Sequence, residues 1–326
     1  MNYLIKSVAV LLGADPKKPA AEDYTAEAIA MHAEQKADKS RIEQIHHELA
    51  HKAQNKIPEK WRRRRWTVLI AVNLLFVLSF QLDIQILEGA LTASRFVGFH
   101  MADLNSALQV MLAYKTVVIN LVIGTTTVLI FWWLLGGRTF CSWVCPYHLL
   151  AELAEMAHDY LSKKNIVKDH PFNRRVRTVF WLVFAVLAFV TGYTVFETIS
   201  PTGILSRTLI YGPGLALVWV ATLLLFEIFY SKRAWCRYAC PIGLTYGLVG
   251  AVSPLKVTYN LSKCFHEGEC KKVCEVPHVL DMVVKGRATD VDLFIGADCT
   301  HCGRCVDACP TNSLNLEFKG LGKLLK

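Results

Sequence analysis

The sequence predicts an α-helical membrane protein in which four transmembrane helices precede a cytoplasmic, bacterial-ferredoxin-like α+β iron–sulfur domain. Three observations lead to this fold class. Hydrophobic residues make up 53% of the 326 residues and charged residues only 19%, whereas soluble domains carry about a quarter of charged residues. The apolar residues are gathered into long blocks. Eleven cysteines lie in tight clusters, and such clusters indicate metal or redox sites rather than a disulfide framework.

The four apolar blocks are the predicted membrane-spanning helices, since a span needs about 20 apolar residues. They cover 67–87, 116–135, 178–196 and 215–230. Most Lys and Arg residues that flank the blocks lie on one side, which predicts a multi-pass protein of the inner (cytoplasmic) membrane with both termini in the cytoplasm. The net charge of +9 is then a feature of membrane topology and does not indicate a nucleic-acid partner.

The expected domains follow from these blocks and from the cysteines. Residues 1–60 form a cytoplasmic helical extension, and within it 21–56 read as a solvated helix without a strong apolar stripe. Residues 61–253 form the four-helix transmembrane domain, and residues 254–326 form the iron–sulfur domain.

Two segments of the transmembrane domain repeat one thiol motif. Arg138-Thr-Phe-Cys141-Ser-Trp-Val-Cys145-Pro146 and Arg233-Ala-Trp-Cys236-Arg-Tyr-Ala-Cys240-Pro241 each follow a predicted outward-to-inward span. Thiols four residues apart share one face of a helical turn, and the proline favours an extended residue before it. Cys141, Cys145, Cys236 and Cys240 are therefore expected to converge. They could hold a metal or cluster, form a redox-active dithiol, or serve as small buried residues.

The tail carries the strongest motif. Cys299-Thr-His-Cys302-Gly-Arg-Cys305-Val-Asp-Ala-Cys309-Pro310 matches the ferredoxin spacing C-x2-C-x2-C-x3-C-P, in which the fourth cysteine binds the other of two clusters. Zinc sites use two pairs separated by a longer loop, so this spacing favours iron–sulfur. With the crossed ligation, Cys299, Cys302, Cys305 and Cys274 are predicted to bind one [4Fe-4S] cluster.

The upstream copy of the motif is altered. Cys264-Phe-His-Glu267-Gly-Glu-Cys270-Lys-Lys-Val-Cys274-Glu275 has a glutamate in place of the second cysteine and another in place of the proline. Cys264, Cys270 and Cys309 are predicted to bind a second cluster, either [4Fe-4S] with Glu267 as a ligand or [3Fe-4S] with that position vacant.

Ionisable residues in or beside the spans are functional candidates, because they are costly there. We regard Glu227, Glu88 and Asp83 as candidate catalytic residues, and Glu197 also lies at a span end. Haem is not expected, because no histidine falls inside a predicted span. Flavin is not expected either, since no glycine-rich dinucleotide fingerprint follows a strand.

These motifs resemble the NapH family of ferredoxin-type membrane proteins, within the wider NapH, NosR and CcoG group. The matching pieces are 141–146, 236–241, Pro277-His278-Val279-Leu280 and Cys302-Gly-Arg-Cys305-Val-Asp, whereas Glu267 and Glu275 depart from the family pattern.

The resemblance implies a quinol dehydrogenase component. Such a protein takes electrons from the membrane quinol pool and passes them through iron–sulfur clusters toward a periplasmic reductase of the nitrate reductase type. A NapG-like periplasmic iron–sulfur protein and a NapC-like multihaem cytochrome would be its partners. The alternative is a membrane-bound factor for iron–sulfur assembly, maturation or metal handling in a respiratory reductase.

Overall fold

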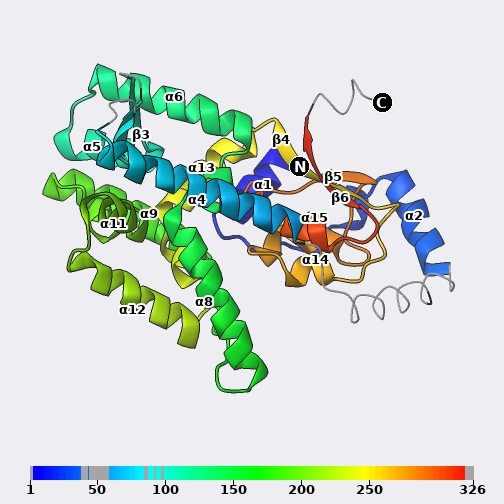
Figure 1. Ribbon diagram of the computed structural model, residues 1–326. Helices are drawn as coiled ribbons and strands as arrows, with labels where there is room; N and C mark the ends of the chain where they lie inside the picture. Colours follow the sequence, from blue (N-terminus) through cyan, green and yellow to red (C-terminus); the bar gives the residue numbers. More distant parts are fainter. Residues whose placement is uncertain are drawn as a thin grey trace.

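A layer of long helices and a smaller unit of strands and short helices lie side by side in the structure (Figure 1). This computed structural model describes residues 3–37, 43, 59–83, 87–91, 93–96 and 99–319. The helical layer contains α4 (Lys60–Gln81), α5 (Leu104–Tyr114), α6 (Ile119–Leu135), α7 (Thr139–Trp143), α8 (Pro146–Lys163), α9 (Arg175–Thr191), α10 (Val195–Ile199), α11 (Pro201–Tyr211), α12 (Ala216–Phe229), the π-helix η2 (Trp235–Ala239) and α13 (Pro241–Ala251).

The prediction of four transmembrane helices is wrong for this structure. Helices do form in the four apolar blocks, as α4, α6, α9 and α12. Within the described ranges, however, none of them unites the length and the apolar character needed to cross a bilayer. Both α6 and α9 have 17 residues, which at 1.5 Å per residue is about 25 Å, and α12 has 14. A bilayer core is about 30 Å thick.

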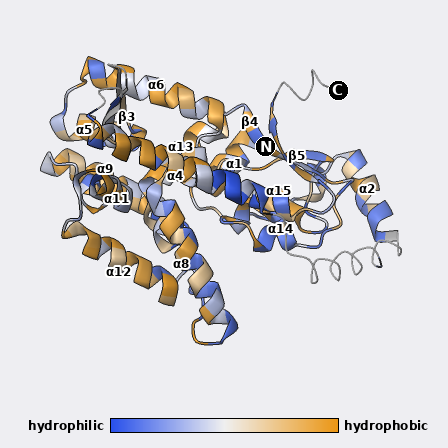
Figure 2. Cartoon of the chain, viewed as in Figure 1, coloured by the Kyte–Doolittle hydropathy of each residue, from blue (hydrophilic) through white to orange (hydrophobic). Residues whose placement is uncertain are grey.

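Backbone conformation explains where two of these helices end. Gly136 and Gly192, directly after α6 and α9, take left-handed conformations with φ of 101° and 66°. Glycine adopts this conformation without steric cost and commonly terminates helices. The longer α4 has 22 residues, but its first turns carry Lys60 and the arginines 62–65. Figure 2 shows this hydrophilic start next to the tail and hydrophobic residues over much of α6, α12 and the remainder of α4.

A small antiparallel sheet lies between α4 and α5, outside the four apolar blocks. It consists of β1 (Leu87–Ala90), β2 (Ala93–Phe96) and β3 (Phe99–Ala102), in the order β1-β2-β3. Asp103 follows β3 directly and caps α5, because its side chain accepts hydrogen bonds from the backbone N–H groups of Asn105 and Ser106.

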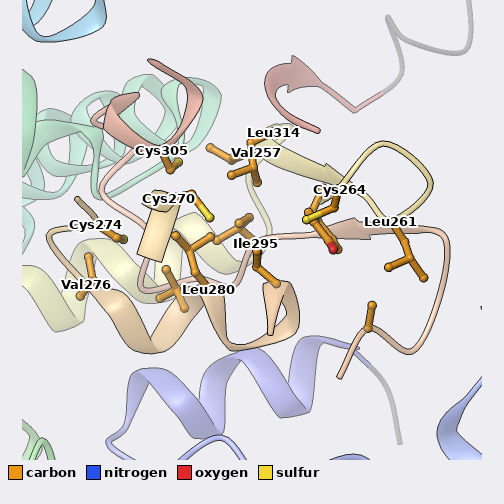
Figure 3. Packing of buried hydrophobic residues seen from close by; sticks show 14 of the residues in the cluster. Val257, Leu261, Cys264, Cys270, Cys274, Val276, Leu280, Ile295, Cys305 and Leu314 are labelled. Atoms are coloured by element: carbon orange, nitrogen blue, oxygen red, sulfur yellow. The ribbon is translucent and has the colours of Figure 1, made fainter. Parts of the chain in front are cut away.

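The tail forms the second unit, around an antiparallel sheet in the order β5-β4-β6. Its elements are β4 (Leu255–Asn260), α14 (Glu269–Lys272), the 3₁₀-helix η3 (Pro277–Val283), β5 (Asp292–Phe294), α15 (Arg304–Ala308) and β6 (Leu314–Phe318). Cysteines pack with aliphatic side chains in its interior, and Figure 3 shows Cys264, Cys270, Cys274 and Cys305 among them.

The N-terminal extension packs on this tail. It contains α1 (Tyr3–Leu11), the 3₁₀-helix η1 (Ala21–Asp23) and α2 (Ala26–Ala37). Tyr3 Oη donates to the carbonyl of Ile295 at 2.9 Å, and Gln35 Nε2 donates to that of Leu261 at 2.9 Å. The described part of the expected solvated helix is therefore docked, while residues 38–42 and 44–58 lie outside the described residues.

Candidate functional site

Four thiols that the crossed ligation assigns to one cluster lie around one cavity of the tail. Cys274, Cys299, Cys302 and Cys305 line this tail cavity. The remaining wall is mostly apolar, with aliphatic side chains from β4, η3 and the segment before Cys299: Val257, Val276, Val279, Leu280 and Ile295. Four thiols in an apolar, water-poor site are the donor set that a [4Fe-4S] cluster requires.

The two ferredoxin loops have the same backbone shape. Gly268 precedes α14 and Gly303 precedes α15, with φ of 81° and 75°. His266 and His301, two positions earlier in each loop, also have positive φ, of 58° and 53°. Glu267 therefore stands in the first loop where Cys302 stands in the second.

Cys264, Cys270 and Cys309 form the other thiol group of the tail. All three belong to or pack against the same hydrophobic core. Burial, and then the charges of Cys264 and Cys309, raise the pKa of Cys270 to about 12. A thiol with such a pKa stays protonated until a metal displaces its proton. Binding of iron to this thiol group is therefore coupled to the release of protons.

The repeated thiols converge on a second cavity, in the helical layer. Cys141, Cys145, Cys236 and Cys240 all line it, and we call it the four-thiol site. Cys141 comes from α7 and Cys236 from η2. The other two thiols precede the prolines that begin α8 and α13.

The repeat fixes the geometry of this site through those prolines. Cys145 has φ of −64° and ψ of 118°, and Cys240 has φ of −71° and ψ of 112°. Proline disfavours a helical conformation in the residue before it and is well accommodated at the first helical position. The two chain segments therefore turn in the same way, and each directs its pair of thiols into the shared cavity.

The arginine of each repeat pairs with a carboxylate next to a cysteine of the tail. Arg138 forms a buried ion pair with Asp298, which precedes Cys299. Arg233 Nη2 lies 3.4 Å from Oε1 of Glu275, which follows Cys274. Both arginines also line the four-thiol site. Two positive charges are thus fixed between the thiols of the helical layer and those of the tail.

The four-thiol site and the tail cavity share part of their walls. Val276 and Thr300 line both cavities. Thr300 Oγ1 donates to Oε2 of Glu275 at 3.0 Å, and the carbonyl of Thr300 accepts from Ser142 Oγ at 2.6 Å. At this place, Val276 and Thr300 alone stand between the two cavities.

His148, Glu152 and Glu275 bring three possible metal ligands together beside the four-thiol site. Arg65 fills the position of a cation between them, because its guanidinium contacts Glu152, lies 2.6 Å from Glu275 Oε1 and lies 2.8 Å from His148 Nε2. Burial raises the pKa of Glu275, but the charges of Arg233, His148 and Arg65 outweigh it and hold this pKa well below its usual range. We therefore infer that His148, Glu152 and Glu275 hold the tail against the helical layer.

Glu227, one of the candidate catalytic residues, is buried next to the four-thiol site. Its Oε1 accepts a hydrogen bond from the backbone N–H of Trp235 at 3.0 Å. The carboxyl group also interacts with the buried hydroxyl of Tyr147. Burial raises the pKa of Glu227 to about 7. A carboxyl group with this pKa can gain or lose a proton near neutral pH.

Of the other two candidates, the structure describes only the side chain of Asp83, which does not line the four-thiol site. Asp83 follows α4 and is exposed. Glu88 lies in β1, and its side chain is outside the described part of the structure. The sequence analysis missed Asp298, Arg65 and the pairing of Glu275, although the arginine at one position of both repeats was a signal for buried partners.

Two families described as 4Fe-4S binding domains match this chain. One covers residues 117–167 and 213–259, which include both repeated thiol motifs. The other covers residues 295–315, which include the ferredoxin motif.

Several similar proteins carry ferredoxin-type names. The chain is 33% identical over 244 residues to methylamine utilization ferredoxin-type protein MauN of Paracoccus denitrificans, covering 74% of this chain and 84% of that protein. It is 30% identical over 257 residues to ferredoxin-type protein NapH of Escherichia coli, covering 76% and 88%. It is 29% identical over 264 residues to MauN of Methylorubrum extorquens, covering 80% and 89%. No solved structure matches the chain.

Proposed function

The chain belongs to the family of ferredoxin-type iron–sulfur electron-transfer proteins that includes NapH and MauN, and we propose that it oxidises quinol and passes the electrons toward a periplasmic reductase. The observation that carries this proposal is the wall of Val276 and Thr300 shared by two cavities that are each lined by four thiols.

The thiols divide into three groups that we propose as cluster sites. The tail cavity offers four thiols for a [4Fe-4S] cluster, and the group around Cys270 offers three, with Glu267 or a vacant position as the fourth. The four-thiol site offers four more. One-electron transfer is the chemistry that iron–sulfur clusters supply when thiolates hold them. The residues of the chain exclude water from the sites and fix them at short range from each other.

Quinol oxidation also releases protons, which need an acceptor. We propose Glu227 for this role, because its carboxyl group is buried beside the four-thiol site, interacts with the hydroxyl of Tyr147 and has a pKa raised to about 7. Tyr147 and Trp235 line the cavity on this side and offer a mixed apolar and polar surface for a quinol ring.

The cytoplasmic membrane is the proposed place of action, since quinol resides in the bilayer. Large apolar side chains are exposed along α4, α6, α9 and α12, for example Leu74, Ile123, Val186 and Leu225. Exposed apolar surface of this extent is typical of a binding face. We propose a NapG-like iron–sulfur protein and a NapC-like multihaem cytochrome as the electron acceptors on the periplasmic side.

Anaerobic EPR spectroscopy with iron quantification tests this function. The purified protein is measured before and after addition of a reduced menaquinol analogue, and dithionite serves as the chemical reductant. We expect quinol to reduce the iron–sulfur clusters, which the change in their EPR signals records. We expect Glu227→Gln to slow this reduction by quinol but not by dithionite. Signals that respond to dithionite and ignore quinol would contradict the quinol proposal.

A further inference from the structure

A hydrogen-bonded chain of four side chains leads from the surface into the interior behind the four-thiol site. Ser106 Oγ contacts Oε1 of Glu197 and lies 3.2 Å from Oδ2 of Asp103. Tyr246 Oη donates to Oδ1 of the same aspartate at 2.7 Å. Glu197 is partly exposed, whereas Asp103 and Tyr246 are buried. We call these four residues the carboxyl relay.

The geometry of the carboxyl relay requires a shared proton. A serine hydroxyl has one hydrogen, so Ser106 can donate to only one of the two carboxyl groups that it contacts. The oxygens of Asp103 already accept from Tyr246 Oη and from the backbone N–H groups of Asn105 and Ser106, at 3.0 and 3.1 Å. Asp103 is thus held as an acceptor, and a proton on Glu197 would let Glu197 donate to Ser106 and Ser106 donate to Asp103. Burial raises the pKa of both carboxyl groups, in agreement with this arrangement.

The inner end of the carboxyl relay lies against the four-thiol site. The ring of Tyr246 stacks on Phe140, with centroids 4.9 Å apart. Phe140 lines the four-thiol site, and Cys141 follows it. The negative charge of Asp103 raises the pKa of Cys141, although burial is the larger cause. Charge on Asp103 and charge at the four-thiol site therefore act on each other through one aromatic layer.

Other charged groups near the carboxyl relay are few among the described side chains. Arg207 of α11 donates to the carbonyl of Glu197 at 3.1 Å and opposes the rise in the pKa of that carboxyl group. Cys141 of α7 faces the relay from the other end. Lys115 lies at the far end of α5. Among the side chains that the structure describes, no Lys or Arg forms an ion pair with Asp103, so a proton can neutralise it.

We propose that the carboxyl relay takes up one proton from solvent when an electron arrives at the four-thiol site. For each electron that a quinol or dithionite donates, the donor is oxidised. Ser106 passes its hydroxyl proton to Asp103, which becomes neutral, and receives the proton of Glu197 in exchange. Glu197 then binds one proton from solvent. When the electron leaves, the proton returns to solvent. The inference rests on the proposed function only in that the four-thiol site holds a redox-active iron–sulfur cluster.

An EPR redox titration at several pH values tests the proposal on the iron-loaded protein. The signal of the four-thiol site is the one that Cys141→Ser removes. We expect its midpoint potential to fall as pH rises, because protons then stabilise the reduced state less. Asp103→Asn should abolish this pH dependence, and its amide oxygen can still cap α5. Tyr246→Phe keeps the stacked ring and should weaken the dependence. Glu317→Gln, in an exposed side chain of β6, should leave it unchanged.

Two results would overturn the proposal in distinguishable ways. If the pH dependence survives in Asp103→Asn, or is absent in the original protein, the relay does not couple protons to electrons, and the proposed quinol oxidation is untouched. If Cys141→Ser removes no signal and no iron, the four-thiol site holds no cluster, and the relay and the proposed electron path fail together.

Discussion

Arg138 and Arg233 occupy the same position in the two repeated motifs, and each pairs with a carboxylate adjacent to a cysteine of the tail. The repeat thus does two things at once. Its cysteines and prolines build the four-thiol site, and its arginines fasten the tail against that site. A position conserved between two halves of one chain is here explained by a shared task at an internal interface.

Asp298→Asn is expected to destabilise this interface strongly. Asp298 balances Arg138 and Arg177, and its Oδ2 lies 2.6 Å from Nε2 of His278. Removing one member of a buried ion pair costs about 3–5 kcal/mol, because the remaining charge stays buried and unpaired. Denaturant unfolding would measure the change. Glu269→Gln breaks a pair with Lys272, which is largely exposed, and should cost far less. Equal effects of the two variants would refute the importance of the buried pair.

The two loop glycines offer a matched comparison. Alanine at Gly268 or Gly303 must adopt the left-handed conformation, which costs roughly 1–2 kcal/mol of stability. A Cβ atom at Gly268 meets nothing within 4 Å, but at Gly303 it would lie 2.5 Å from Cγ of Trp61. Gly303→Ala should therefore lose about 1–3 kcal/mol more than Gly268→Ala, through overpacking. Thermal unfolding of both variants is the measurement, and a smaller loss at Gly303 would show that Trp61 does not pack there.

Glu267→Cys should complete the first ferredoxin motif. The backbone of this position matches that of Cys302, so a thiol placed there joins the group around Cys270 as a fourth ligand. We expect more iron per chain and an added [4Fe-4S] signal in EPR. Cys302→Ser is the opposite control and should lose iron and stability, because metal binding contributes to folding of the tail. An unchanged iron content in Glu267→Cys would mean that Glu267 does not stand at a ligand position.

We expect the contribution of Lys256 to stability to increase at alkaline pH. Burial lowers its pKa from 10.5 to about 8 in the folded protein. Between these values the unfolded chain binds a proton that the folded protein has released, so the contribution of Lys256 to the free energy of unfolding increases with pH across this window. Lys256→Met should remove that increase, whereas Lys272→Met, at an exposed position, should retain it. Denaturant unfolding at several pH values measures this. The prediction is incorrect if the free energy of unfolding changes with pH equally in the two variants.

Sequence reasoning was strongest where chemistry depends on local spacing. The ferredoxin motif and the repeated thiols each lie within about a dozen residues, and the structure brings the corresponding thiols into two cavities. The family resemblance is confirmed by NapH and MauN proteins that match most of the chain.

The errors arose where the outcome depends on helix ends or on distant partners. Apolar composition suggested spans, but Gly136 and Gly192 stop α6 and α9 after 17 residues. The pairs Arg138–Asp298 and Arg65–Glu275 join residues separated by 160 and 210 positions. No local sequence pattern predicts an ion pair between residues this far apart in the chain. Asp103 was overlooked because it precedes a helix that the apolar blocks did not include.

The tail contributes Glu275, Val276 and Thr300 to the lining of the four-thiol site. These residues cover thiols that belong to the helical layer, so the docked tail acts as a cover over an inner compartment. Under the proposed function, iron for the four-thiol site must enter before the tail docks or while the tail is displaced. Loading of this site and closure of the arginine pairs are then linked.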